Sequence, residues 1–549
     1  MRPLTPTHWD SEAAARWRRL GLWPDEPLGD TLTLAARRWG HRVAVVDHST
    51  RITFGRLDEL SRRLATVLLR CGVVPGDVVC LQLPSWWETI ALTVASWRVG
   101  AVANPVLPNL RAREMAAITG EVTPRVLVVP ERFRGFEHRA MADSIDHGAH
   151  LIVVRCRSGD DPGDLARLVA EAEPADDQTL EQCRPEPDAA ALVLYTSGTS
   201  GRAKGVIHTH NTLRAEADGV GLGHQCRTDD VMLLTMPLAH IGGVLYGILL
   251  LLTTGLRVVL MDTWDSDEAL RLTEQEGVTV HPTVPVVARG LLRAPSFRPA
   301  AVRSMRLLTF GGASVTPADV EEAAAAFGCW CKRSYGSTEM PTLTSGPRHD
   351  PKGRVATTDG VVMGASEVRT VSDGGVDVGS GTGGEIWCRG PELFVGYVDA
   401  GFNPEAFAPG GWYRTGDLGT LDDDGFLTVT GRKKDVIIRG GENISPQEVE
   451  AVLLEQPEVS EVAVVAMPDP VMGERSCAFV VTSDPGFDFA TMAARVRAGG
   501  LAAFKIPERL ELRAALPRTP TGKIRKDALR DEIAGLLRAG DAGPPPRPA

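Results

Sequence analysis

The stretch Tyr195-Thr-Ser-Gly-Thr-Ser-Gly-Arg-Ala-Lys-Gly-Val206 organises the sequence around it. It follows a short apolar run, 189–194, that predicts a buried strand. From Thr196 to Lys204 it carries four hydroxyl side chains, two glycines and one lysine. Glycines let the backbone bend tightly, successive amides form an anion-binding nest, and hydroxyl and ammonium groups donate to phosphate oxygens. The stretch therefore predicts a loop that holds a polyphosphate, although a solvated Ser/Gly loop has a similar composition.

This loop is not a Walker P-loop, because Gly205 and Val206 follow Lys204 where that motif needs Ser or Thr opening a helix. It resembles the phosphate loop of the adenylate-forming superfamily, which includes acyl-CoA synthetases, firefly luciferase and peptide-synthetase adenylation domains. The proline usual before the lysine is Ala203 here, at a position that carries no chemistry. The resemblance implies catalytic roles for Thr196 and Lys204, and ATP binding by Thr196, Ser197, Gly198, Thr199, Ser200, Gly201 and Lys204.

The composition is that of an ordinary globular protein. The 549 residues are 43% hydrophobic and 23% charged, and the chain is too long for one compact core. A net charge of −11 argues against general affinity for nucleic acid or an anionic membrane. Nine scattered cysteines without zinc-type spacing favour a reducing, cytoplasmic setting. We expect no transmembrane segment, because the longest apolar run, 244–252, is too short to span a bilayer.

Strands and helices alternate through most of the chain. Helical spacing of Leu57, Leu60, Leu64 and Leu68 predicts an amphipathic helix. Residues 158–188, which are acidic and contain several prolines, predict one surface helix with loops. The predicted strands are 43–47, 78–83, 126–129, 151–154, 231–235 and 305–310. This alternation predicts a parallel, doubly wound α/β architecture.

The C-terminal region has the pattern of a small α+β domain. Ser445 and Glu448, with Pro446 between them, form a capping-box pattern that predicts a helix through Glu455. Further predicted strands are 459–467, 477–482 and 509–513, and further predicted helices are 489–498 and 527–537.

We therefore predict an α/β protein in which a large N-terminal domain of layered α/β subdomains is joined by a hinge to the small α+β domain. The N-terminal domain, 1–432, would bind AMP and the acyl group. Residues 433–536 would form the mobile catalytic domain, and 537–549 a disordered tail.

Tyr335-Gly-Ser-Thr-Glu339 combines an aromatic face, a tight turn, a hydroxyl and a carboxylate. Mg²⁺ prefers hard oxygen ligands and is commonly held by one or two carboxylates plus substrate phosphates. The resemblance implies that Tyr335 stacks on adenine, Thr338 contacts phosphate and Glu339 holds Mg²⁺. The other ATP-binding positions it implies in this region are Gly311, Gly312, Ala313, Gly336 and Ser337. Taken alone, the motif also fits an ordinary turn that ends in an exposed glutamate.

Three further segments match the family in its order. A carboxylate can accept hydrogen bonds from both ribose hydroxyls, so Asp417 is the predicted ribose ligand. The resemblance gives Arg432 a ribose or phosphate contact and makes Lys434 the hinge. It also implies a coenzyme A channel beside Gly440, Gly441 and Glu442.

The sequence Pro520, Thr521 and Gly522 predicts a turn that presents Lys523. Lysines in such loops are usually solvated, but this loop resembles the family's C-terminal catalytic lysine loop. The resemblance therefore makes Lys523 catalytic. It covers residues 32–526 in all.

His240 follows a predicted strand, at the end where open α/β sheets place their ligands. Amino-acid-activating relatives carry an acidic residue after this motif, and dihydroxybenzoate-type relatives carry asparagine after the histidine. Here Ile241 and Val244 follow it, so we predict an acyl pocket of His240, Ile241 and Val244 for an apolar acid. Residues 104–109 and 133–136 resemble cyclohexanecarboxylate and short- to medium-chain acyl-CoA ligases, which favours a small or medium aliphatic or alicyclic acid.

The resemblance implies an acyl-CoA synthetase that uses ATP, Mg²⁺ and coenzyme A. The acid would attack the α-phosphorus of ATP, pyrophosphate would leave, and the thiol of coenzyme A would then displace AMP. No carrier domain follows Lys523 in the sequence, which favours free coenzyme A. The main alternative is a stand-alone ligase that loads a carrier protein, and luciferase-like oxygenation or binding without catalysis are less favoured.

Overall fold

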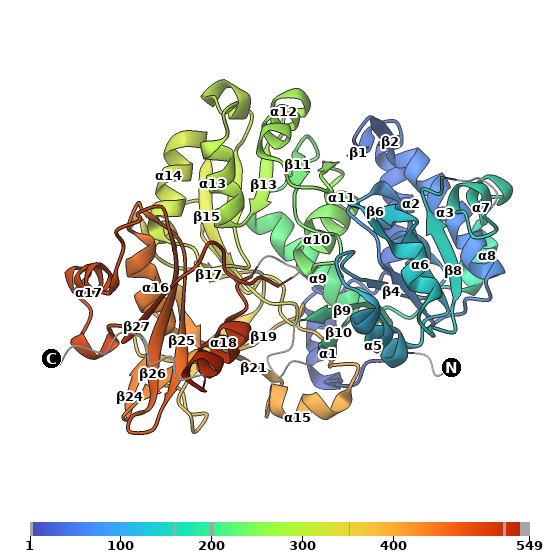
Figure 1. Cartoon of the computed structure of the whole chain (residues 1–549). Helices are drawn as coiled ribbons and strands as arrows, with labels where there is room; N and C mark the ends of the chain where they lie inside the picture. Colours follow the sequence, from blue (N-terminus) through green and yellow to red (C-terminus); the bar gives the residue numbers. More distant parts are fainter. Residues whose placement is uncertain (1–3, 158–160, 197–202, 351, 520–522, 539–549) are drawn as a thin grey trace.

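The computed structural model describes residues 4–157, 161–196, 203–350, 352–519 and 523–538. Figure 1 shows the C-terminal elements (orange to red) gathered on one side of the larger N-terminal part (blue to yellow). The chain is mixed α/β with a large N-terminal and a small C-terminal domain, as predicted.

The largest sheet has six parallel strands flanked by antiparallel edges. Its strands 231–234, 257–260 and 307–310 are short, apolar and almost fully buried, as expected where helices cover both faces of a sheet. In spatial order the strands are β17 (Val361–Val362), β16 (Thr344–Ser345), β15 (Trp330–Tyr335), β14 (Leu307–Phe310), β13 (Val280–Thr283), β11 (Val231–Leu234), β12 (Arg257–Leu260), β1 (Val43–Asp47) and β2 (Thr50–Thr53).

A second sheet carries the candidate phosphate loop. Its strands are parallel except β10, which runs antiparallel to β9, so the loop at 197–203 joins two neighbouring strands. In spatial order they are β10 (Lys204–Thr209), β9 (Ala190–Thr196), β4 (Val102–Pro105), β3 (Val78–Leu81), β5 (Val126–Pro130) and β8 (His150–Val154). The two sheets confirm the predicted doubly wound parallel architecture.

A third, antiparallel sheet leads to the domain boundary. Its strands are β18 (Glu367–Val371), β19 (Gly384–Arg389), β21 (Trp412–Leu421), β20 (Phe407–Ala408) and β22 (Leu427–Arg432). A turn between residues 421 and 427 joins β21 to β22, which pair in antiparallel register.

Helices cover the two large sheets. The predicted amphipathic helix is confirmed as α3 (Phe54–Arg70), whose four leucines at helical spacing are all buried in the largest core cluster. The other main helices are α1 (Ser11–Arg19), α2 (Leu28–Trp39), α4 (Trp87–Arg98), α5 (Ala112–Val122), α6 (His138–Asp143), α9 (His210–Gly223), α12 (Ser266–Glu276), α13 (Pro285–Arg293) and α14 (Pro317–Phe327).

The acidic segment before the phosphate loop differs from the prediction of one surface helix. Its described part holds two short helices, α7 (Leu165–Glu171) and α8 (Asp177–Gln182). The backbone turns extended at Ala172. Pro174 follows, and proline cannot continue a helix because it lacks the N–H and clashes with the preceding turn.

The C-terminal domain is a mainly antiparallel sheet with helices packed on it. Its strands are β24 (Glu442–Ile444), β23 (Ile437–Arg439), β26 (Gly473–Thr482), β25 (Val459–Asp469) and β27 (Arg509–Leu512). Its helices are α16 (Pro446–Leu454), α17 (Phe489–Ala498) and α18 (Lys526–Arg538).

The predicted capping box at the start of α16 is wrong. Ser445 occupies the N-cap position, but its side chain makes no capping hydrogen bond. Its hydroxyl instead donates to the carbonyl of Thr430 at 2.7 Å, across the domain boundary, and Glu448 pairs with Lys505. A tertiary partner has therefore displaced the local one.

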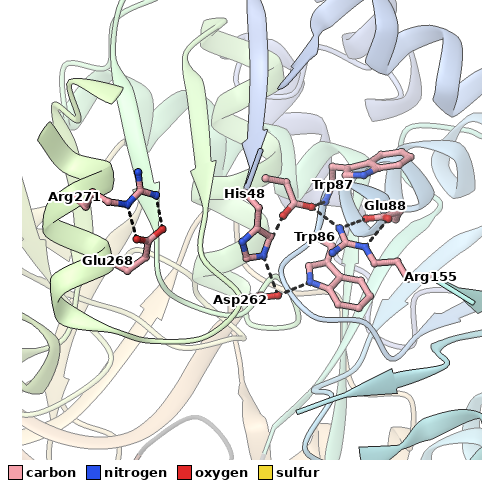
Figure 2. Close-up of polar contacts among 9 residues, drawn as sticks. His48, Trp86, Trp87, Glu88, Arg155, Asp262, Glu268 and Arg271 are labelled. Carbon is pink, nitrogen blue, oxygen red and sulfur yellow. Dashed lines mark hydrogen bonds and ion pairs between the residues drawn. The ribbon is translucent and has the colours of Figure 1, made fainter. Parts of the chain in front are cut away.

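A polar cluster joins the two large sheets at the carboxyl ends of their strands (Figure 2). Asp47 ends β1 of the nine-stranded sheet, and Arg155 follows β8 of the six-stranded sheet. Arg155 donates to Asp47 at 2.6 Å and to Glu88 at 2.9 and 3.0 Å, and it lies 3.8 Å from the Trp86 ring centroid. The Trp86 indole donates to Asp262, which follows β12, at 2.6 Å. These contacts fix the relative placement of the strand ends from which the site loops emerge.

The buried carboxyl of Glu216 should make the free energy of unfolding depend on pH. Glu216 of α9 is 3% exposed, and burial, aided by the charge of Glu392, raises its pKa to about 8. The folded chain therefore keeps a proton that the unfolded chain loses above about pH 4.5. The stability that Glu216 contributes is complete below that pH and is lost as the pH rises toward 8, by roughly 1.4 kcal/mol per pH unit.

We expect Glu216→Gln to remove this loss, because the amide cannot ionise. The melting temperature of the variant should exceed that of the wild type by a margin that grows between about pH 5 and pH 8. Thermal unfolding at several pH values measures it. Glu321→Gln, at an exposed position of α14, is the matched control. A difference in melting temperature between Glu216→Gln and the wild type that stays constant from about pH 5 to pH 8 would contradict the prediction.

Candidate active site

The two ends of the predicted phosphate loop lie side by side on neighbouring antiparallel strands. Thr196 ends β9 and Lys204 begins β10, and the two residues are paired in the antiparallel register. The Lys204 ammonium lies 5.0 Å from the ring centroid of Tyr397 and 4.6 Å from that of Phe402. The predicted ligands Ser197, Gly198, Thr199, Ser200 and Gly201 lie outside the described residues.

The Tyr335–Glu339 motif is a tight turn at the end of β15. A Cβ on Gly336 would come within 2.0 Å of the Pro341 carbonyl oxygen, so only glycine fits there. The Ser337 amide donates to the Met340 carbonyl at 2.8 Å, and the Met340 amide donates to the Ser337 hydroxyl at 3.2 Å. This turn brings Glu339 to a position where it is only 8% exposed.

His208 of β10 supports the same turn from behind. Its Nε2 lies 2.8 Å from the Thr338 carbonyl oxygen, and its Nδ1 lies 3.2 Å from the Thr212 hydroxyl. Burial lowers the pKa of His208 to about 4, so the ring is neutral and can donate to the carbonyl through Nε2. The strand that begins with Lys204 therefore also fixes the backbone that carries Glu339.

Asp417 links the first and third sheets. It lies in β21, is 7% exposed, accepts a hydrogen bond from the Tyr335 hydroxyl at 2.7 Å and pairs with Arg432 at 3.0 Å. Burial and the charge of Asp417 hold the pKa of Tyr335 well above its usual value, which keeps the phenol protonated. Tyr335, Asp417 and Arg432, predicted from separate motifs, are thus in direct contact.

The glycine pair after β14 lies beside this group. β14 and β15 are adjacent parallel strands, and a Cβ on Gly311 would lie 3.3 Å from the Ser334 carbonyl oxygen. Gly312 has φ +73°, which favours glycine, and Ala313 is exposed. The loop of the predicted ATP-binding positions 311–313 therefore lies next to the strand that ends in Tyr335.

Lys523 of the C-terminal domain lies within electrostatic range of this group. Its amide donates to the Thr519 hydroxyl at 3.0 Å, and its carbonyl accepts from the Thr519 amide at 2.6 Å. Part of the side chain is exposed, but burial of the ammonium lowers the pKa of Lys523. The charge of Arg432 acts in the same direction, and the charges of Asp417 and Glu339 oppose it.

His240 caps the short helix α10 (Ile241–Val244), which continues into a π-helical turn (Leu245–Leu249) and α11 (Leu250–Thr254). The His240 Nδ1 accepts from the Gly242 amide at 3.1 Å. Burial, with a contribution from the charge of Lys523, lowers the pKa of His240 to about 4. Lys523 and His240 therefore lie within electrostatic range of each other. Ile241 is 4% exposed and Val244 has no exposed surface, since both pack into the main core.

The ion pairs on the two sides of the predicted hinge join it to different domains. Lys433 pairs with Asp373 at 2.9 Å and with Glu385 at 3.2 Å, both of the N-terminal domain. Asp435 pairs with Arg530 of the C-terminal helix α18. Lys434 lies between them and is exposed.

Gly440 and Gly441 form the exposed turn between β23 and β24, and the exposed Glu442 begins β24. The two glycines have φ of +56° and +95°, and the Gly440 amide donates to the Met472 carbonyl within the C-terminal sheet. Their described hydrogen bonds lie within their own domain, not with the group around Glu339. Their assignment to a coenzyme A channel stays a prediction.

Two tyrosines that contact Glu339 or each other were not predicted from the sequence. The Tyr397 hydroxyl donates to Glu339 Oε1 at 2.9 Å, and the Tyr413 side chain is hydrogen-bonded to Tyr397. Tyr397 is 58 residues from Glu339 in sequence, so no local spacing signals the contact. The available signal was composition, because the chain has only five tyrosines and three of them lie here.

The donor set at Glu339 fits Mg²⁺ held together with substrate phosphates. The carboxylate is a hard oxygen ligand, is nearly buried, and has one oxygen fixed by Tyr397. Within the described ranges, no group of three or more His, Cys, Asp or Glu side chains could hold a metal ion by itself. A metal at Glu339 would therefore need oxygens from a bound ligand.

Comparison with known proteins identifies the family. The model of the AMP-binding enzyme family matches residues 32–398, and that of the AMP-binding enzyme C-terminal domain matches residues 448–523. The chain is 32% identical over 541 residues to medium-chain fatty-acid–CoA ligase of Escherichia coli (strain K12), covering 96% of this chain and 94% of that protein.

Two further relatives span nearly the whole chain. It is 35% identical over 549 residues to salicylyl-CoA synthase / salicylate adenylyltransferase of a Streptomyces species, covering 97% of this chain and 98% of that protein. Its fold is similar to that of ATP-bound MatB from Rhodopseudomonas palustris, with a TM-score of 0.83 and 28% identity over 93% of this chain and 99% of that one.

Over the described ranges, no helix is long and apolar enough to cross a membrane. The two family models cover most of the chain, and the motifs that match them converge on one site. The chain therefore belongs to the AMP-binding enzyme family, and its relatives support the acyl-CoA ligase branch of that family.

Proposed function

We propose that this protein activates a carboxylic acid with ATP to an acyl-adenylate and transfers the acyl group to the thiol of coenzyme A. The observation that carries the proposal is the direct contact of Asp417 with Tyr335 and Arg432, which were predicted from separate motifs. Lys523 of the C-terminal domain lies within electrostatic range of this group and of Glu339. The Lys523 ammonium, placed near the carboxylates of Glu339 and Asp417, suits a reaction between a carboxylate and a phosphate, which are both anions.

In the first half-reaction a carboxylate oxygen forms a bond to the α-phosphorus, and the bond from that phosphorus to pyrophosphate breaks. Attacking acid and phosphate are both negative, so the site must offset their repulsion. Lys204 and the loop amides would hold the phosphates, and Lys523 would bridge the acid and the nucleotide. Mg²⁺ on Glu339 would neutralise phosphate charge when bound.

The same group of side chains would orient the nucleotide. Asp417 would accept from the ribose hydroxyls while Arg432 and Tyr335 hold its carboxylate in place. In the second half-reaction the thiol attacks the acyl carbonyl, the C–S bond forms, AMP leaves and the thiol proton is released. Lys523 serves the first step only, which is why it would be carried on a mobile domain.

For the acid we propose a small or medium apolar compound, aliphatic or alicyclic. Burial keeps His240 neutral near pH 7, and the residues that follow it are apolar, so nothing at this position favours a second charge on the substrate. The relatives carry both fatty-acid and salicylate names, so aromatic acids belong in the test.

Pyrophosphate release with ATP and Mg²⁺, with and without coenzyme A, tests this function. The acids should run from acetate to dodecanoate and include cyclohexanecarboxylate, benzoate, hydroxybenzoates and amino acids. We expect turnover on an apolar acid that depends on coenzyme A. Adenylation without coenzyme A turnover would indicate a carrier-protein acceptor, and a preference for hydroxybenzoates or amino acids would contradict the proposed substrate.

Lys523→Ala should separate the two half-reactions. Loss of one preorganised charge typically costs about 100-fold or more in rate, so adenylate formation should fall by that factor. Thioester formation from supplied acyl-AMP should stay near the wild-type rate. Arg525→Ala, an exposed cation two residues along, is the matched control. Equal loss of both half-reactions in Lys523→Ala would refute its assigned role.

Lys434→Pro should have the opposite effect. Proline fixes φ and would restrict rotation between the ion pairs of Lys433 and Asp435. Adenylate formation should persist, while overall thioester formation should slow by about tenfold or more, equivalent to about 1.4 kcal/mol of barrier. Separate assays of the two steps measure this, and normal overall turnover would count against Lys434 as the hinge.

A further inference from the structure

Among the residues that the structure describes, Tyr397 contacts both a candidate metal-binding anion and a candidate phosphate-binding cation. Its hydroxyl donates to Glu339 Oε1 at 2.9 Å. Its ring centroid lies 5.0 Å from the Lys204 ammonium, within the range of a cation–π contact. Neither contact follows from the family motifs that carry Glu339 and Lys204.

The structure holds Tyr397 rigidly. Its amide donates to the Asn403 side chain at 3.0 Å, and its carbonyl accepts from the Thr7 hydroxyl at 2.6 Å. It forms an antiparallel bridge with Val206, two residues after Lys204. The residue is 3% exposed, and its ring packs against Phe394 with centroids 4.9 Å apart. Glu339 and Lys204 therefore both contact a side chain whose position is fixed by its neighbours.

The hydroxyl of Tyr397 is itself oriented. Tyr413 is hydrogen-bonded to Tyr397, so the Tyr397 oxygen can accept from Tyr413 while it donates to Glu339. A phenol is protonated at neutral pH, so the Tyr397 hydroxyl keeps the proton that it donates to Glu339. This bond fixes one of the two carboxylate oxygens of Glu339.

The ring of Tyr397 acts together with Phe402. The Lys204 ammonium lies 4.6 Å from the Phe402 ring centroid, and the two rings are 6.0 Å apart in an edge-to-face arrangement. Two aromatic faces thus restrict a flexible side chain next to the phosphate loop. A restricted ammonium loses less conformational entropy when it binds phosphate.

We propose that Tyr397 is a positioning residue that aims the Glu339 carboxylate through its hydroxyl and places the Lys204 ammonium through its ring. This inference rests on the proposed function for the roles of Glu339 and Lys204. It separates two effects of one side chain: the hydroxyl sets affinity for the divalent cation, and the ring sets affinity for the nucleotide phosphates.

Binding measurements with a non-hydrolysable ATP analogue test both effects without relying on turnover. Isothermal titration would give the apparent dissociation constant of Mg²⁺ at a fixed concentration of the analogue. A second titration, in EDTA, would give the affinity for the metal-free analogue. Four variants separate the contributions: Tyr397→Phe, Tyr397→Leu, Phe402→Leu and, as a matched loss of a buried hydroxyl that bonds to His224 at 3.0 Å, Tyr246→Phe.

Tyr397→Phe should weaken Mg²⁺ binding by roughly tenfold, the usual effect of losing a partner of a metal ligand, and leave metal-free binding unchanged. Phe402→Leu should weaken metal-free binding by about threefold, from loss of one cation–π contact, and leave the apparent Mg²⁺ constant unchanged. Tyr397→Leu should show both defects. Tyr246→Phe should show neither.

An unchanged Mg²⁺ constant in Tyr397→Phe, or an equal loss of Mg²⁺ and metal-free binding, would overturn the proposal. If Tyr397→Phe does not fold, Tyr413→Phe replaces it in the test. This variant should weaken Mg²⁺ binding by a smaller factor, because it removes a hydrogen bond to Tyr397 and not to Glu339 itself. An unchanged dissociation constant of Mg²⁺ in Tyr413→Phe would again overturn the proposal. Wild-type protein that binds the analogue with Mg²⁺ but adenylates no acid would refute the proposed function and leave the role of Tyr397 standing.

Discussion

The arrangement of the site depends on the contacts of the buried Asp417 carboxylate with Tyr335 and Arg432. Tyr335, at the end of β15 in the largest sheet, donates to it, and Arg432, at the end of β22 in the third sheet, pairs with it. An anion this buried is strongly destabilising without partners, so both are held against it. One ion thereby fixes two sheets relative to each other. Arg432 also immediately precedes the hinge segment, so the same pair sets where the C-terminal domain begins.

The placement of Lys523 on a separate domain has a physical reason. Burial and the charge of Arg432 make its protonated form less favourable in the site, and the carboxylates of Asp417 and Glu339 offset this. A second step in which a thiol attacks a carbonyl does not need that ammonium. A cation carried on a domain can be withdrawn between steps, whereas one fixed in the N-terminal sheets could not. The exchange of ion-pair partners on either side of Lys434 is suited to such a motion.

Features set by local physics were predictable from the sequence. The strand 43–47 and the helix 489–498 match their predicted bounds, because apolar periodicity and turn residues act over a few positions. The capping hydrogen bonds of α16 were not, because the Ser445 side chain is oriented toward the Thr430 carbonyl, 15 residues away, and the Glu448 side chain toward Lys505. The motif residues Tyr335, Asp417 and Arg432 were predicted singly, but their mutual contact depends on sheet packing that no spacing encodes.

The missed residues show why the site uses tyrosine around its carboxylates. Tyr335 donates to Asp417, and Tyr413 and Tyr397 form a chain that ends on Glu339. At Glu339, a lysine or arginine in place of Tyr397 would orient the carboxylate but would also offset the charge that it needs for a divalent cation in the proposed function. A serine would be too short to reach from a neighbouring sheet. The phenol supplies a long, rigid and uncharged donor with little entropy to lose, and the same ring can face a cation on its other side.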